Sequence, residues 1–68
     1  MAETLGERLA ALRREKGISQ AELARLLNLG QSTIAMYERD RRTPDPLTLR
    51  RLAAFFGVSV DYLLGRTP

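Results

Sequence analysis

The sequence feature that most constrains the fold is a pair of helix-length segments separated by three turn residues, Asn28-Leu29-Gly30. Ser19 followed by Glu22 is a capping-box signal for the start of the first helix. Asn and Gly tolerate turn conformations best, so this helix should end near Asn28 and a second should run from Gln31 to about Arg39. The small side chain of Ala24, at the expected crossing point, lets the two helices meet at a steep angle.

Each of three further segments begins with a residue that caps helices and ends at a glycine: Thr4 to Gly17, Asp45 to Gly57 and Ser59 to Gly65. Apolar residues recur at helical spacing within the segments and predict the core. The expected core residues are Leu5, Leu9, Leu12, Leu23, Ala24, Leu27, Ile34, Tyr37, Leu49, Leu52, Ala53, Phe56 and Leu63. No strand signal or internal repeat interrupts this pattern. We expect an all-α fold of five helices.

The chain length allows one domain, which we place over residues 1–68. With 44% apolar and 28% charged residues, the composition is that of a globular protein. The apolar runs near the carboxyl end are too short to span a bilayer, and the amino end lacks a secretion signal. These features predict a soluble protein of the cytoplasm.

The absence of cysteine and histidine excludes disulfides and nearly every zinc site. The sequence also lacks a glycine-rich phosphate loop, and its carboxylates Glu22, Glu38 and Asp61 are isolated. We therefore expect no enzyme activity, no metal, no cofactor and no small-molecule ligand.

Basic residues outnumber acidic residues by 11 to 8, and ten of the eleven are arginine. Arginine suits planar contacts to phosphate and guanine, so this bias favours a nucleic-acid partner. A solvated, arginine-rich surface explains the composition equally well. The densest basic stretch is the loop expected over residues 39–44.

Spacing alone leaves two interpretations of the segment from Gln20 to about Arg39. A helix, a tight turn and a second helix can place the second helix in the major groove of DNA. Helix hairpins with short turns are also common in purely structural bundles. The pattern of residues beyond this segment distinguishes between them.

The order and spacing of several short blocks resemble the phage repressor and Cro family, also called the XRE family, from Leu9 to Gly65. The blocks are Ser19-Gln20-Ala21-Glu22-Leu23-Ala24, Leu29-Gly30-Gln31-Ser32-Thr33-Ile34, Tyr37-Glu38-Arg39 with Pro44, Leu52-Ala53, and Phe56-Gly57-Val58-Ser59-Val60-Asp61-Tyr62-Leu63-Leu64. The resemblance implies a compact five-helix repressor-like domain with a helix-turn-helix over about residues 20–39. It also implies a transcriptional regulator of a bacterium or a phage-infected cell, a repressor that binds a palindromic operator as a homodimer. Asn28 and Asp40 stand where the family favours glycine, and both residue types tolerate a left-handed backbone.

The resemblance implies base contacts from the second helix of this motif. Gln31 would pair with adenine through its amide, and Ser32 could donate to guanine N7 or to a phosphate. Met36, on the same face as Ser32, would offer an apolar contact to a thymine methyl. The plainer interpretation of Gln31 and Ser32 is that they are polar residues of a first helical turn.

Phosphate contacts are implied for Gln20, Thr33, Arg41 and Arg42. Gln20 matches a glutamine that bonds a phosphate and braces the residue matching Gln31, and Thr33 is expected to contact the DNA backbone or its own helix. Gln20 could instead be a helix-surface residue, and the two arginines could belong to a solvated loop.

Two structural contacts complete the expectations. Arg13 and Glu38 match a partly buried ion pair that joins the first helix to the end of the third. Val60 and Tyr62 match residues of a symmetric dimer contact, and Leu47 is an apolar residue left outside the small core.

The alternative function is that of an antitoxin or another protein-interaction module built on the same fold.

Overall fold

The computed structural model describes residues 4–66, and the regular secondary structure of that part is helical throughout. The five helices are α1 (Leu5–Glu15), α2 (Gln20–Leu27), α3 (Gln31–Glu38), α4 (Pro46–Phe56) and α5 (Val60–Leu63). The all-α, five-helix prediction is confirmed, and α3 ends one residue earlier than expected.

Local capping bonds explain where the helices begin. The Thr4 hydroxyl accepts from the backbone N–H of Glu7, and the Glu7 carboxylate accepts from the backbone N–H of Thr4. Ser19 and Glu22 form the same reciprocal pair at the start of α2. These bonds satisfy backbone donors that have no partner within the helix.

Left-handed backbone conformations end α2 and follow the end of α3. Asn28 has φ 55° and Asp40 has φ 58°, and they are the two non-glycine residues with positive φ in the described part of the chain. After Asp40, the Arg41 N–H donates to the Met36 carbonyl at 2.9 Å, which closes the end of α3 in a Schellman motif. The two positions where the sequence departs from the family's glycine therefore keep the backbone that glycine favours.

Each helix contributes one fully buried large side chain to a single core. The five are Leu9, Leu23, Ile34, Leu52 and Leu63, each 0% exposed. Phe56, which was expected in the core, is half-buried. It packs against the core beside Phe55, and the two rings meet edge-to-face with centroids 5.0 Å apart.

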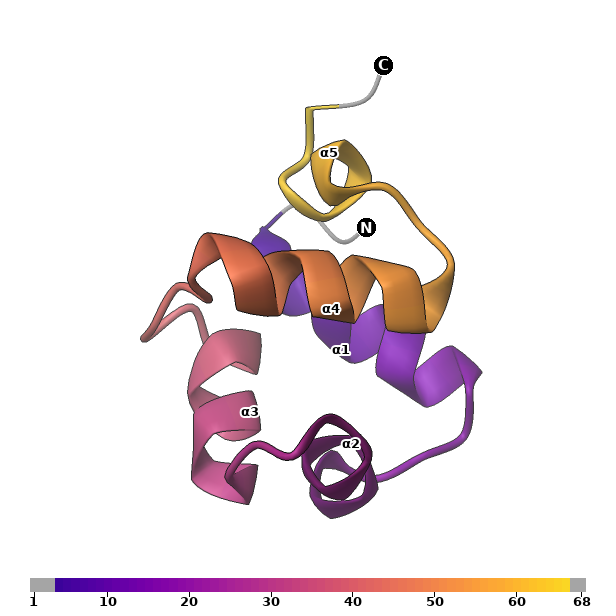
Figure 1. Ribbon diagram of the computed structural model, residues 1–68, viewed down its shortest axis with the longest axis vertical. Helices are drawn as coiled ribbons and strands as arrows, with labels where there is room; N and C mark the ends of the chain where they lie inside the picture. Colours follow the sequence, from indigo (N-terminus) through magenta and orange to yellow (C-terminus); the bar gives the residue numbers. More distant parts are fainter. Residues whose placement is uncertain (1–3, 67–68) are drawn as a thin grey trace.

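The helices are arranged around this core with α2 and α3 on one side (Figure 1). In that view α2 is seen end-on while α3 lies along the left-hand edge, so the two helices cross steeply. The helix α1 packs against α3 and α5, and α4 packs against α5. This frame leaves the outer face of α3 at the edge of the molecule.

Candidate nucleic-acid interface

The turn between α2 and α3 is fixed by backbone bonds and by a side chain from outside the motif. The Leu29 N–H donates to the Ala24 carbonyl at 2.8 Å, and Ala24 itself is 3% exposed. From α4, the Arg51 guanidinium donates to the Leu27 carbonyl at the end of α2. The arginine supplies positive charge where helix carbonyls lack partners. The motif is thus anchored to the rest of the fold.

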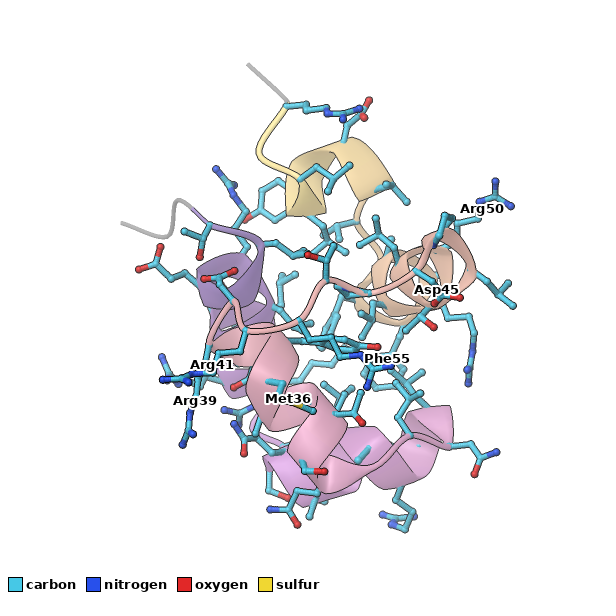
Figure 2. The ribbon with its side chains drawn as sticks, turned by 90° about the vertical axis from the view of Figure 1, so that its left-hand side faces the viewer. Met36, Arg39, Arg41, Asp45, Arg50 and Phe55 are labelled. Atoms are coloured by element: carbon cyan, nitrogen blue, oxygen red, sulfur yellow. The ribbon has the colours of Figure 1, made fainter. Side chains whose placement is uncertain are left out.

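The outer face of α3 carries the residues expected to contact bases. Gln31 and Ser32 are exposed, while Thr33 and Met36 are half-buried. Ser32 and Met36 are four residues apart and share one face of the helix. Figure 2 shows Met36 on the side of α3 turned toward the viewer. Polar side chains at the amino end of α3 therefore adjoin an apolar one further along.

An arginine-rich loop follows α3. Arg39, Arg41 and Arg42 are exposed, and Figure 2 shows Arg39 and Arg41 close together at the edge of the molecule, beyond the end of α3. At the other end of the loop, Pro44 is buried. The loop thus presents cations beside the outer face of α3.

A hydrogen-bonded network joins α1, α2 and α3 behind that face. Arg13 Nε donates to Glu38 Oε2 at 2.6 Å and Arg13 Nη2 to Glu38 Oε1 at 3.0 Å, so the ion pair is bidentate. Gln20 Nε2 donates to the same Oε1 at 3.0 Å. The two charged side chains are 12% and 6% exposed.

The network shifts the titration of both charged groups. Burial acts to raise the pKa of Glu38, but hydrogen bonds from Arg13 and Gln20 outweigh it and hold the pKa below its ordinary value. The hydrogen bond to Glu38 raises the pKa of Arg13. Both groups therefore remain charged near neutral pH.

The amide of Gln20 has a different partner from the one that the resemblance implied. It was expected to brace Gln31, but its amide nitrogen donates to Glu38. The contact joins the amino end of α2 to the carboxyl end of α3. No sequence signal identified this contact, since it joins residues 18 positions apart.

The carboxylate of Asp40 is a further contact that the sequence did not indicate. Its Oδ1 accepts from the Gly6 N–H at 2.9 Å and its Oδ2 accepts from the Thr4 hydroxyl at 2.6 Å. A Cβ at Gly6 would lie 2.5 Å from the Tyr37 carbonyl oxygen and 2.6 Å from that of Glu38. The amino end of α1 thus abuts the backbone at the end of α3.

The three residues expected at a dimer contact differ in exposure. Leu47 is 64% exposed and Tyr62 37%, while Val60 is half-buried and packs against the core. The Arg8 guanidinium lies 5.1 Å from the centroid of the Tyr62 ring. Leu26, which the core prediction did not consider, is 51% exposed.

Metal-binding and membrane-spanning features are absent from residues 4–66. No group of histidine, cysteine and acidic side chains there could hold a metal ion. Within the same residues, no helix has the length and apolar character needed to cross a membrane.

A comparison with known protein families identifies the family of this chain. The family model described as helix-turn-helix matches residues 9–63. The chain belongs to the helix-turn-helix family. This agrees with the resemblance to the XRE family that the sequence blocks indicated.

Relatives of this helix-turn-helix chain include regulators from bacteria and phages. The transcriptional regulator ImmR of Bacillus subtilis is 46% identical over 63 residues, which are 93% of this chain and 50% of ImmR. The immunity repressor protein of Bacillus phage phi105 is 39% identical over 91% of this chain and 43% of its own length. The chain thus spans about half the length of these two relatives.

Solved helix-turn-helix structures share the fold. The P22 c2 repressor, crystallised with a synthetic operator, superposes with a TM-score of 0.88 at 31% identity, covering 94% of this chain and 97% of the repressor chain. A transcriptional regulator from Listeria innocua gives a TM-score of 0.87 at 34% identity, covering all of this chain and 64% of the other. Both likenesses cover all or nearly all of this chain.

Proposed function

We propose that this chain is the sequence-specific, double-stranded DNA-binding domain of a transcriptional repressor. The observation that carries the proposal is the outer face of α3, where exposed Gln31 and Ser32 adjoin half-buried Met36 beside an arginine-rich loop. Polar side chains read base edges in the major groove, and arginines contact phosphates. The likeness to a repressor solved with an operator supports the same use of this face.

In the proposed complex, Gln31, Ser32 and Met36 contact bases. Gln20, Thr33, Arg41 and Arg42 contact phosphates. Gln20 can serve as a phosphate contact while it is held by Glu38, because an amide nitrogen has two N–H donors and the network uses one. Glu38 and Arg13 then act behind the interface, keeping α2 and α3 at a fixed crossing.

The experiment that tests DNA binding is selection of duplexes from a random-sequence pool by the purified chain. We expect one sequence to be enriched, and the affinity for it to fall with salt by about 0.9 log units per phosphate contact for each log unit of salt concentration. Failure to enrich any sequence would refute the proposal and would favour the protein-interaction module.

Two substitutions separate base contacts from phosphate contacts. Gln31→Ala should lose about 1–3 kcal/mol on the selected duplex and relax the preference at one base pair. Arg42→Ala, the control in the loop, should weaken binding to selected and unrelated duplexes alike. Equal loss of specificity in both variants would contradict these roles.

We further propose that two copies bind a palindromic operator through a contact made by Leu47, Val60 and Tyr62. A two-fold pair would place the two α3 helices about 34 Å apart, one turn of the DNA helix. The small number of apolar residues implies a weak dimer that forms mainly on DNA.

Quantitative footprinting on paired half-sites tests the dimer. Tyr62→Ala should abolish cooperative filling of two half-sites and leave binding to a single half-site intact. Leu26→Ala is the matched control, because it truncates an exposed leucine outside the proposed contact. Cooperative filling by the Tyr62→Ala variant would place the interface elsewhere.

A further inference from the structure

The carboxylate of Asp40 links two parts of the molecule that have different tasks in the proposed function. Its backbone lies in the loop that carries the exposed arginines, directly after α3. Its side chain accepts from the Gly6 N–H and the Thr4 hydroxyl, both at the amino end of α1. An aspartate there also faces the positive end of the α1 dipole.

The loop is consequently held at both of its ends. At the α3 end, the left-handed Asp40 directs the Arg41 N–H to the Met36 carbonyl, and the Asp40 side chain fixes the turn to α1. At the α4 end, Pro44 is buried. Arg41 and Arg42 lie between these anchors with exposed side chains. A short segment fixed at both ends has little conformational freedom left to lose on binding.

We propose that Asp40 is a positioning residue for DNA binding, whose carboxylate anchors the arginine loop to the start of α1 and so holds Arg41 and Arg42 ready for phosphate contacts. This inference rests on the proposed function. Asp40 itself does not touch DNA. It acts by lowering the ordering cost that the two arginines would otherwise incur when they bind.

A negative charge among three arginines also acts in the opposite direction, because it repels phosphate. Removal of the carboxylate therefore has two effects that must be separated: loss of the anchor and loss of the charge. Two substitutions do so, since asparagine and glycine both tolerate the left-handed backbone at this position.

Asp40→Asn removes the charge and keeps the anchor. The amide oxygen can still accept from the Gly6 N–H, and the amide nitrogen can donate to the Thr4 hydroxyl, which has acceptor capacity. Asp40→Gly removes both the charge and the anchor. At constant net charge, the difference between the two variants combines loss of the anchor with the added backbone freedom of glycine, and the Gly6 amide reports the anchor alone.

The experiment measures the affinity of both variants for the duplex selected by the unaltered chain. We expect Asp40→Gly to bind about two- to tenfold more weakly than Asp40→Asn, because arginine side chains on a freed loop must be ordered when they bind. When Arg41 and Arg42 are both replaced by alanine, this difference in affinity should disappear. If Asp40 had a purely structural role, the difference would remain. Hydrogen exchange of the Gly6 amide, measured by NMR, should be slow in Asp40→Asn and faster in Asp40→Gly.

Equal affinities of Asp40→Gly and Asp40→Asn would overturn the inference while leaving the proposed function intact. A difference that persists without the two arginines would also overturn it, since the effect would then not pass through them. If the unaltered chain enriches no duplex, the proposed function is refuted rather than the role of Asp40. The exchange rate of the Gly6 amide then shows only whether the Asp40 anchor exists.

Discussion

Replacement of Gly6 by alanine tests the contact between α1 and the end of α3. Gly6 lies in the first turn of α1, where alanine favours the helix by up to about 1 kcal/mol over glycine. Helix propensity alone therefore predicts a more stable protein. The structure predicts the opposite sign, because the new Cβ would lie 2.5 Å from the Tyr37 carbonyl oxygen and 2.6 Å from that of Glu38.

The expected loss follows from what would have to move. Both close atoms belong to the backbone, so neither can rotate away, and the amino end of α1 must shift outward. Overpacking of this kind costs about 1–3 kcal/mol. The shift would also weaken the bond from the Gly6 N–H to the Asp40 carboxylate, and bonds to charged groups contribute about 1.5–3 kcal/mol.

After the gain in helix propensity is set against these costs, Gly6→Ala should reduce the free energy of unfolding by about 2–4 kcal/mol. For a domain of this size, that lowers Tm by at least about 10 °C. Circular dichroism during thermal and urea unfolding measures both quantities. Gly30→Ala is the control, since its Cβ would lie 3.4 Å from the flexible Thr33 hydroxyl, and it should cost less than about 1 kcal/mol. An unchanged or higher Tm for Gly6→Ala would refute the packing argument.

Three further predictions concern stability. Arg13→Met should reduce the free energy of unfolding, measured in urea titrations, by about 3 kcal/mol, because it leaves the buried Glu38 carboxylate without its cation. A loss below about 1 kcal/mol would contradict this role of the network. The folded-state pKa of Glu38 is lowered, so the stability that the ionised carboxylate contributes is present above its ordinary pKa near 4.5 and is lost as the pH falls further. Glu38→Gln should reduce the dependence of the free energy of unfolding on acid pH. An acid transition unaltered in this variant would argue against the contribution of Glu38. Asn28→Ala should cost about 1 kcal/mol because Asn28 has φ 55°, whereas Asn28→Gly should cost nothing, and equal stabilities would show that the left-handed backbone is not the cause.

Helix boundaries could be predicted from the sequence because the interactions that set them are local. The Thr4–Glu7 and Ser19–Glu22 boxes join residues three positions apart, and the left-handed Asn28 acts on its own helix. The exposure of Gln31 and Ser32 follows from the same local information, since it depends on which side of α3 carries Ile34. Such features need no knowledge of how the helices pack.

Apart from the Arg13–Glu38 pair, which the family resemblance implied, the side-chain contacts between distant segments were not predicted. Gln20 meets Glu38 across 18 positions, Arg51 reaches Leu27 across 24, and Asp40 meets Gly6 across 34. Each depends on a polar side chain whose sequence neighbourhood suggests only a solvated surface. The partial exposure of Phe56 was not predicted for a related reason: its ring packs against the adjacent Phe55 ring at the end of the helix, and periodicity does not describe such a contact.

The placement of one fully buried side chain on every helix has a consequence for how independently each helix can move. Because the five side chains meet in one cluster, no helix can detach without opening the cavity that its own side chain filled. The shortest helix, α5, is tied to the global unfolding equilibrium by Leu63 in the same way that α3 is tied to it by Ile34. Local melting of α3 would open the cavity that Ile34 fills, so its free-energy cost is coupled to the core. Any change in the orientation of α3 within the domain must therefore repack Ile34 against the other four buried side chains.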